Sequence, residues 1–181
     1  LASSITTEKM VQDYTKMLTS KLELKTLTEK ALFKIMEATD SDAGALFIER
    51  DGNLVSVENS GIKNPEKLTN HPIVMEVLNN ESRKITEVPE DIVVDGLLVN
   101  FKPKEIIVEP LMYSDVPIGV IVLASLSKYN DENINGTAMF SQSLSLALHN
   151  AITHEQMQTL AAIDVLTGLL NRRYGMMRLR E

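Results

Sequence analysis

The chain lacks cysteine and tryptophan, and aromatic side chains make up only 4% of its 181 residues. Without a thiol it cannot form disulfides, use a thiolate nucleophile, hold a metal through a thiolate or attach a chromophore through a cysteine thioether. The low aromatic content argues against a large planar cofactor, which would need stacking partners. The absence of cysteine also fits a cytoplasmic location best, and the sequence names no cofactor.

The chain also lacks an excess of positive charge and a long hydrophobic run. Its formal net charge of −7 makes phosphate backbones and anionic lipid surfaces poor partners, because both require a basic face. The longest apolar stretch, 116–126, is far shorter than the roughly 20 residues that span a bilayer. The opening LASSITTEKM has neither an initiator Met nor a signal core. We therefore expect a fragment of a longer protein, without a nucleic-acid or membrane partner.

Hydrophobic periodicity predicts helices at both ends of the chain. Residues 7–22 form an amphipathic pattern, and Thr26 with Glu29 resembles a capping box that starts a second helix ending near Thr39. A long helix is predicted over 130–166, where its first half presents an apolar face to a sheet.

The middle of the chain alternates between strand patterns and one helix pattern. Asp51-Gly52 predicts a hairpin turn, because this pair readily adopts positive φ angles. The predicted strands are 43–50, 53–61, 83–89, 105–113 and 117–126, with a helix at 71–81 and a loop or short helix at 90–105. This order indicates an α+β fold, an antiparallel sheet with helices on its faces.

The second half of the last helix has a weak heptad pattern. Its positions are Thr153, Met157, Leu160, Asp164 and Thr167. We interpret Met157 and Leu160 as part of a parallel homodimer stalk, helped by the amphipathic N-terminal helix. The alternative is a solvated helical tail.

No group of residues in the sequence points to catalysis or metal binding. The three histidines, His71, His149 and His154, form no H-E-x-x-H pattern. The acid pairs Asp40/Asp42 and Glu90/Asp91 fit solvated turns, and the serines at 141, 143 and 145 lie on a helix without an elbow turn. We expect no enzymatic activity, no catalytic residue and no metal.

The segments ESRKITEVPED and EIIVEPLMYSDVPIGVIVLASLSKYNDENINGTAMFSQSLSLALHNA resemble those of GAF domains, and the resemblance extends over about 26–151. It implies a small molecule held between the sheet and a covering segment. The residues it implicates are Phe47, Ile92, Val93, Leu97, Leu98, Phe101, Val108 and Leu123. For Leu98 and Phe101 the alternative is ordinary core packing. A bound tetrapyrrole lacks its cysteine, NFKPKE does not match the cyclic-nucleotide motif N-K-x-F-D-E, and His149 is more typical of a surface or capping residue than of a haem ligand.

The segment DVLTGLLNRR resembles the D-x-L-T-x-L-x-N-R-R start of GGDEF domains, the catalytic domains of diguanylate cyclases. The resemblance implies a helix break that relays a signal to a downstream GGDEF domain. The relay residues would be Asp164, Thr167, Gly168, Asn171, Arg172 and Arg173. No G-G-D/E-E-F run follows, so we expect this chain not to make cyclic di-GMP, although its parent would be a diguanylate cyclase.

These inferences divide the chain into four parts. They are an N-terminal helix (1–24), a GAF-like sensory domain (25–151), a connecting helix (152–166) and the truncated start of a GGDEF domain (167–181). Two functions stay open at this point: a module that senses an unknown small molecule, and a dimerisation and relay module that binds none.

Overall fold

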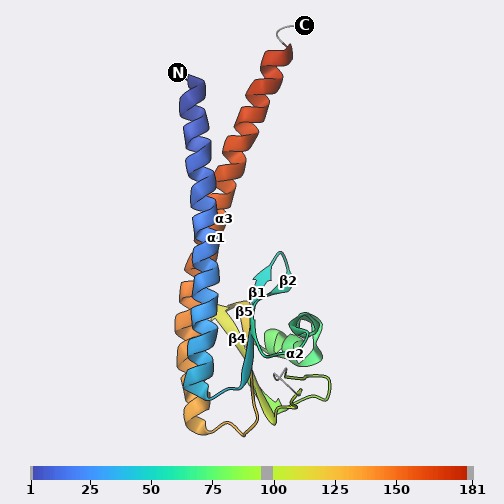
Figure 1. Ribbon diagram of the computed structural model, residues 1–181. Coiled ribbons are helices and arrows are strands. Elements are labelled where there is room, and N and C mark those ends of the chain that lie inside the picture. Colours follow the sequence, from blue (N-terminus) through green and yellow to red (C-terminus); the bar gives the residue numbers. More distant parts are fainter. Residues whose placement is uncertain (1, 95–99, 179–181) are drawn as a thin grey trace. The chain divides into compact units, whose positions relative to one another are not determined.

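The computed structural model describes residues 2–94 and 100–178 (Figure 1). The chain divides into two compact units. One contains Leu27–His149, and the other contains Leu1–Thr26 together with Asn150–Glu181. Two long helices, α1 (Ala2–Thr39) and α3 (Asp131–Arg178), contribute to both units.

The unit Leu27–His149 is built on a five-stranded antiparallel sheet with the strand order β2-β1-β5-β4-β3. The strands are β1 (Ala43–Arg50), β2 (Asn53–Ser60), β3 (Lys84–Glu87), β4 (Glu105–Tyr113) and β5 (Val116–Ser125). The predicted α+β class and all five predicted strands are confirmed. The central strand, β5, is almost continuously buried, as its apolar sequence requires.

Two tight turns set the register of the hairpins. At the β1–β2 turn, Asp51 and Gly52 have φ angles of 53° and 82°, and at the β4–β5 turn Ser114 and Asp115 have 49° and 60°. Consecutive positive φ angles match the right-handed twist of paired strands. The predicted Asp51-Gly52 hairpin is therefore confirmed.

Strand alternation gives the sheet two different buried faces. Gly44 on β1 faces α1, because a Cβ placed there would lie 3.0 Å from Leu32 and 3.2 Å from Met36. Gly119 on β5 has no room for any side chain, since a Cβ would lie 2.4 Å from the Phe47 carbonyl oxygen. Glycine at 119 thus permits the close pairing of β1 with β5.

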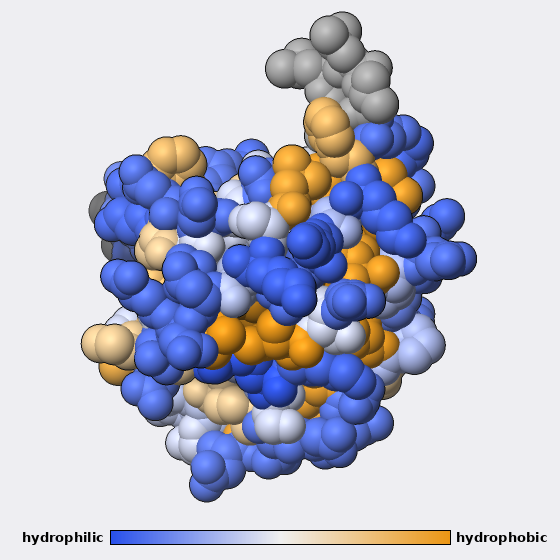
Figure 2. All heavy atoms as spheres, turned by 90° about the horizontal axis from the view of Figure 1, so that it is seen from below, coloured by the Kyte–Doolittle hydropathy of each residue, from blue (hydrophilic) through white to orange (hydrophobic). Residues whose placement is uncertain are grey.

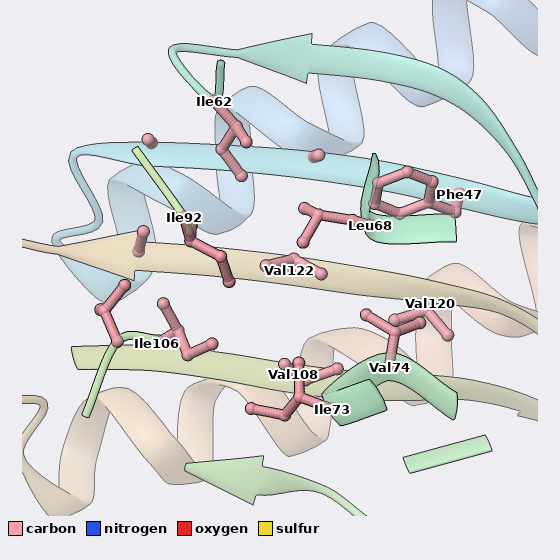
Figure 3. Close-up of a cluster of buried hydrophobic side chains, with 14 of the residues drawn as sticks. Phe47, Ile62, Leu68, Ile73, Val74, Ile92, Ile106, Val108, Val120 and Val122 are labelled. Carbon is pink, nitrogen blue, oxygen red and sulfur yellow. The ribbon is translucent and has the colours of Figure 1, made fainter. Parts of the chain in front are cut away.

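The other face of the sheet is covered by a short 3-10 helix, η1 (Pro65–Asn70), by α2 (Pro72–Asn80) and by the segment 88–94 (Figure 3). Their apolar side chains join those of the strands in one buried cluster. Its members include Phe47, Ile62, Leu68, Ile73, Val74, Val77, Ile92, Ile106, Val108, Val120 and Val122. This cluster fills the space between the sheet and its covering layer.

The predicted break before Thr26 is wrong, because α1 runs without interruption from Ala2 to Thr39. The Thr26 hydroxyl donates to the Leu22 carbonyl oxygen at 3.0 Å, so its hydrogen-bond donor has a partner within the helix. Threonine costs less than about 0.7 kcal/mol in a helix relative to alanine. That cost is smaller than the loss of the backbone hydrogen bonds that a break would require.

The second unit consists of the N-terminal part of α1 and the C-terminal part of α3. Within it, the Ser20 hydroxyl and His154 Nδ1 lie 3.1 Å apart, and Leu24 and Ala162 are buried. Its described side chains nevertheless leave a large apolar surface exposed. The exposed residues are Val11, Tyr14, Leu18, Leu22, Met157, Leu160, Ile163, Leu166 and Leu170.

The face shown in Figure 2 is mostly hydrophilic, with apolar side chains gathered in a few patches between polar ones. Over the described residues, neither long helix has a stretch that is apolar enough to cross a membrane.

Candidate functional site

A cavity of about 220 Å³ lies in the unit Leu27–His149, beside the covering layer. Three segments contribute its walls: the connection from β2 to η1, η1 itself, and the segment 88–94, which we call the covering segment. The lining residues are Ile62, Lys63, Asn64, Lys67, Leu68, His71, Asp91, Ile92 and Val93. The walls combine apolar side chains with polar and charged ones.

The covering segment is held at the cavity by backbone pairing. The Lys63 amide donates to the Val93 carbonyl oxygen at 2.9 Å, and Val94 forms bridges with Ile62 and with Phe101. The Val94 and Phe101 amides donate to each other's carbonyl oxygens at 2.9 and 2.8 Å. These few bonds anchor the segment without making it a strand of the main sheet.

A side-chain hydrogen bond also joins two residues of the cavity lining. His71 Nε2 lies 2.9 Å from Asp91 Oδ2, and His71 Nδ1 accepts from the Ile73 amide at 3.2 Å, which caps the start of α2. With Nδ1 as the acceptor of the Ile73 amide, the ring donates to Asp91 through its Nε2 proton. The hydrogen bond from His71 holds the pKa of the Asp91 carboxyl below its ordinary value.

The predicted ligand-contacting residues fall into several groups. Ile92 and Val93 do line the cavity, whereas Phe47 and Val108 lie in the core cluster, which fills the space we expected a ligand to occupy. Leu123 is buried on the opposite face, against Gly44, because strand alternation points it toward α1. It therefore cannot share a site with Phe47.

Phe101 does not belong to the cavity lining. Phe101 is 46% exposed, and its backbone amide and carbonyl pair with those of Val94. Leu97 and Leu98 lie outside the described residues.

Sequence reasoning missed most of the polar wall. Lys63, Asn64 and Lys67 belong to a connection with Pro65 and with Asn64 in the left-handed region at φ 50°. Such loops often bear function, but no fixed spacing of residues distinguishes this one. The only available signal was GIKNPEK, a turn-rich and basic stretch in an acidic chain.

A second hollow of about 550 Å³ lies along the C-terminal part of α1, beside the end of β2. Its lining includes the apolar side chains of Leu32, Phe33 and Met36. The lining carboxylates are Glu29, Glu37, Asp40 and Glu58. It is wider and more open than the first cavity, and it does not contact the covering segment.

A buried ion pair connects the sheet to α3. The Glu109 carboxylate on β4 is paired with the Arg83 guanidinium through both oxygens, and Glu109 Oε1 also accepts from the Ser141 hydroxyl of α3 at 3.0 Å. The Ser141 hydroxyl lies 2.9 Å from the Ala138 carbonyl oxygen as well. Because Glu109 is only 7% exposed, these partners are needed to stabilise its charge.

A stacked pair of rings makes a further contact between β4 and α3. The rings of Tyr113 and His149 have centroids 3.5 Å apart and an interplanar angle of 8°. His149 thus packs on the sheet beside an aromatic ring.

The predicted relay residues lie on α3, and the predicted helix break is wrong for the described backbone. Asp164, Thr167 and Gly168 are exposed positions inside an unbroken helix that continues to Arg178. In an unbroken helix, every interior backbone N–H and C=O group forms a hydrogen bond within the helix. The stability gained from these bonds outweighs the cost of about 1 kcal/mol for one glycine. Asn171, Arg172 and Arg173 share this backbone, but their side chains lie outside the described residues.

The predicted stalk residues are exposed on the same helix. Met157 is 63% exposed and Leu160 is 66% exposed. The described residues of the chain leave most of both side chains uncovered, so a partner could reach them.

An antiparallel five-stranded sheet with long helices on one face and a short-helix covering layer on the other defines an α+β domain. The GAF domain family model matches residues 23–148, so the chain belongs to the GAF family. It is a GAF sensory domain, a kind of domain found in signalling proteins. No curated protein matches the chain by sequence.

Solved structures show the same fold. The GAF domain of a phosphoenolpyruvate-protein phosphotransferase from Coxiella burnetii superposes with a TM-score of 0.59 at 15% identity, covering 80% of this chain and 96% of that one. The second GAF domain of DevS from Mycobacterium smegmatis gives 0.55 at 18% identity, with 74% and 99% covered. The GAF domain of a sensor histidine kinase from Bacillus halodurans gives 0.54 at 10% identity, with 71% and 95% covered. At these identities the likeness concerns the fold alone.

Proposed function

We propose that this chain is the regulatory sensory module of a signalling protein, and that a small molecule binds in the 220 Å³ cavity. The observation that supports this proposal is the construction of the cavity wall. Ile62, Leu68 and Ile92 belong both to the cavity lining and to the core cluster. A ligand that displaces the covering segment would therefore disturb the packing on the sheet.

The sheet offers a direct route from the cavity face to α3. On β4, Val108 belongs to the core cluster on the cavity face, and the next residue, Glu109, bonds to Ser141 of α3. Adjacent residues of one strand point to opposite faces. A shift of β4 would thus move the contacts on both sides together, and α3 would transmit the change along its length.

We further propose that the output is a GGDEF domain and that the parent protein is a cytoplasmic diguanylate cyclase. The support is the match of DVLTGLLNRR to the start of that family at eight positions. The unbroken α3 gives a rigid connection of 1.5 Å per residue through Asp164 and Thr167. The chain itself contains no G-G-D/E-E-F run, so its own role is regulatory.

Homodimer formation through the helical unit is part of this proposal. On α1, Val11, Leu18 and Leu22 are exposed at intervals of seven and four residues, and on α3 Met157 and Leu160 are exposed at an interval of three. This spacing places each set on one helix face. Exposed apolar faces of this extent are typical of an interaction surface.

A second function is favoured by the filled interior of the domain. Phe47 and Val108 are fully buried in the core cluster, which occupies the space between sheet and covering layer. The module could then act as a dimerisation and relay element that binds no small molecule. The two functions differ in one property, the occupancy of the cavity.

Native mass spectrometry of the freshly purified chain, compared with the denatured mass, tests both functions. A dimer with excess mass that disappears on denaturation supports sensing and gives the mass of the ligand. A dimer of bare chains that also stays bare after incubation with cell extract supports the relay function. A bare monomer at every concentration contradicts the proposed stalk.

A further inference from the structure

The part of α3 that belongs to the unit Leu27–His149, the globular unit, has a buried face and an opposite, exposed face. Its buried side chains recur at intervals of three and four residues, as expected for the inner face of a helix. They are Thr137, Ser141, Leu144, Ser145 and Leu148. Met139 and Leu146 lie on the other side and are 74% and 54% exposed. Their interval of seven residues places both side chains on one stripe of the helix.

The exposed face of this part of α3 carries no formal charge. Residues 133–149 contain no Asp, Glu, Lys or Arg, although charged residues make up 24% of the chain and a stretch of this length would carry about four at that share. Over 150–163 the one formally charged residue is Glu155, which is only 6% exposed. The exposed positions in the globular unit are instead neutral, and they include Asn135, Met139, Gln142, Ser143 and Leu146.

α1 packs on the same face of the sheet and shows the opposite pattern (Figure 1). Its Phe33 is 68% exposed, but positions 29, 30, 34 and 37 around it are Glu, Lys, Lys and Glu. Charged residues of both signs are typical of a helix face that meets water. An uncharged face with protruding apolar side chains is typical of the centre of an interface, from which charged residues are depleted.

The lack of charge favours a second copy of this chain as the partner at this face. In a symmetric pair, each residue near the twofold axis lies against its own equivalent, so a charge there would meet an equal charge. Because the chain has a net charge of −7, two copies repel each other overall, and this repulsion is weakest where the facing surfaces are uncharged. A seven-residue interval also lets equivalent side chains of two parallel helices meet in successive layers.

We propose that the α3 face around Met139 and Leu146 is a contact surface for a second copy of this chain, with the two α3 helices parallel and in register. Met139 then packs against its own equivalent, and Leu146 does the same two helical turns further on. This inference rests on the proposed homodimer and extends its contact from the helical unit to the globular unit. The two sensory domains are then in direct contact, in addition to being joined by the stalk.

Single cysteines test this contact without background, because the chain contains no cysteine. Met139→Cys and Leu146→Cys each place two thiols where the pairing brings equivalent residues together, close to the Cβ separation of about 4 Å in a disulfide. We expect both variants to form covalent dimers under mild oxidation, measured by intact-mass spectrometry. Phe33→Cys provides a thiol of comparable exposure on α1 and should form far fewer. Cross-linking at only one of the two α3 positions would contradict the parallel, in-register arrangement.

Two substitutions of the same kind locate the effect on self-association. Met139→Glu should weaken dimer formation about tenfold or more, because the contact loses a large apolar side chain and gains a pair of like charges. Phe33→Glu makes the same change of charge at similar exposure on α1 and should leave the dissociation constant unchanged. Sedimentation equilibrium measures both, and the amide spectrum reports whether each variant stays folded. Equal weakening by both variants would mean that added negative charge alone opposes association, which contradicts the proposed surface.

The outcomes separate this inference from the proposed homodimer. If the chain dimerises, but the two α3 cysteines cross-link no more than Phe33→Cys and Met139→Glu leaves association unchanged, the extended contact is wrong while the stalk dimer stands. If the chain stays monomeric at every concentration, both are contradicted, and the uncharged face belongs to another partner. If both cysteines cross-link and Met139→Glu weakens association, both are supported.

Discussion

The two units of this chain differ in how far they bury their apolar side chains. In Leu27–His149, the strands and the covering layer bury a continuous cluster, in which Phe47, Val74, Val108 and Val122 have no exposed surface. In the helical unit, nine large apolar side chains of the described residues remain exposed. The first unit buries this cluster within its own packing, whereas the second leaves its apolar side chains exposed, as is typical of an interaction surface.

We expect the two units to contribute differently to function because of this difference in burial. A packed interior resists small displacements and transmits them, because its side chains are close-packed with few voids. A helix with an exposed apolar face responds to the concentration of its partner. The proposed sensing site and the proposed dimer stalk thus lie in different units, and variants of each should affect different measurements.

The largest effect is expected at the buried ion pair of the globular unit. Replacing Arg83 with Met leaves the Glu109 carboxyl buried without its guanidinium partner, and should lower the free energy of unfolding by about 3–5 kcal/mol. The double change Arg83→Met with Glu109→Leu removes both charges and should lose much less. Urea unfolding followed by circular dichroism measures both. If the double variant is no more stable than the single one, the pair does not act as a unit.

The second-largest effect is expected when charged side chains are introduced on the exposed apolar face of the helical unit. Met157→Glu with Leu160→Glu should weaken self-association about 100-fold or more, since each buried side chain of this size contributes about 1.5–3 kcal/mol. Sedimentation equilibrium measures the change. The swap Met157→Leu with Leu160→Met keeps the apolar surface and should retain the association. Because the globular unit is not altered, its amide spectrum should be preserved in both variants, and dimers that survive the charged change would exclude this face as the interface.

A smaller effect is expected at Tyr129 of the globular unit. Its hydroxyl lies 2.8 Å from the Ser41 hydroxyl, which lies 2.7 Å from that of Thr39, and burial raises the pKa of Tyr129 well above its usual range. Tyr129→Phe should lower the free energy of unfolding by about 1 kcal/mol at pH 7.

The same group predicts the direction of a pH effect. Since the folded-state pKa is raised, the stabilisation by neutral Tyr129 is complete below the unfolded-state pKa of about 10 and is lost as the pH rises above it. Unfolding measured from pH 8 to pH 11 should show a steeper loss for the unaltered chain than for Tyr129→Phe. Identical slopes would mean that Tyr129 ionises as easily in the folded chain as in the unfolded one.

The sequence predicted the sheet well and the cavity poorly, and the reasons are physical. Asp51-Gly52 fixes a hairpin through local backbone preferences, and the apolar run of β5 admits few positions other than the centre of a sheet. By contrast, the pairing of His71 with Asp91 depends on the tertiary path of a loop. Spacing along the chain does not encode such a contact, so the sequence predicts only a solvated turn for Asp91 and no role for His71.

The two wrong helix boundaries have a common cause. Thr26 and Gly168 are residues that often mark helix ends, but each is tolerated inside a helix at a cost of about 1 kcal/mol or less. A cap signal is weak evidence when the flanking residues can continue the helix. The placement of Leu123 failed for another reason, since its face was fixed by the register of β5 against β1, which the sequence pattern left open.

The hydroxyl of Ser141 has a single proton and two acceptors within reach, Glu109 Oε1 at 3.0 Å and the Ala138 carbonyl oxygen at 2.9 Å. Only one of these bonds can form at a time. If α3 turned away from β4, the hydroxyl could keep the carbonyl oxygen as its acceptor, so the buried donor would stay paired. The buried Glu109 carboxylate would then lose one of its charge-assisted hydrogen bonds, and this loss favours the position in which Ser141 and Glu109 are joined.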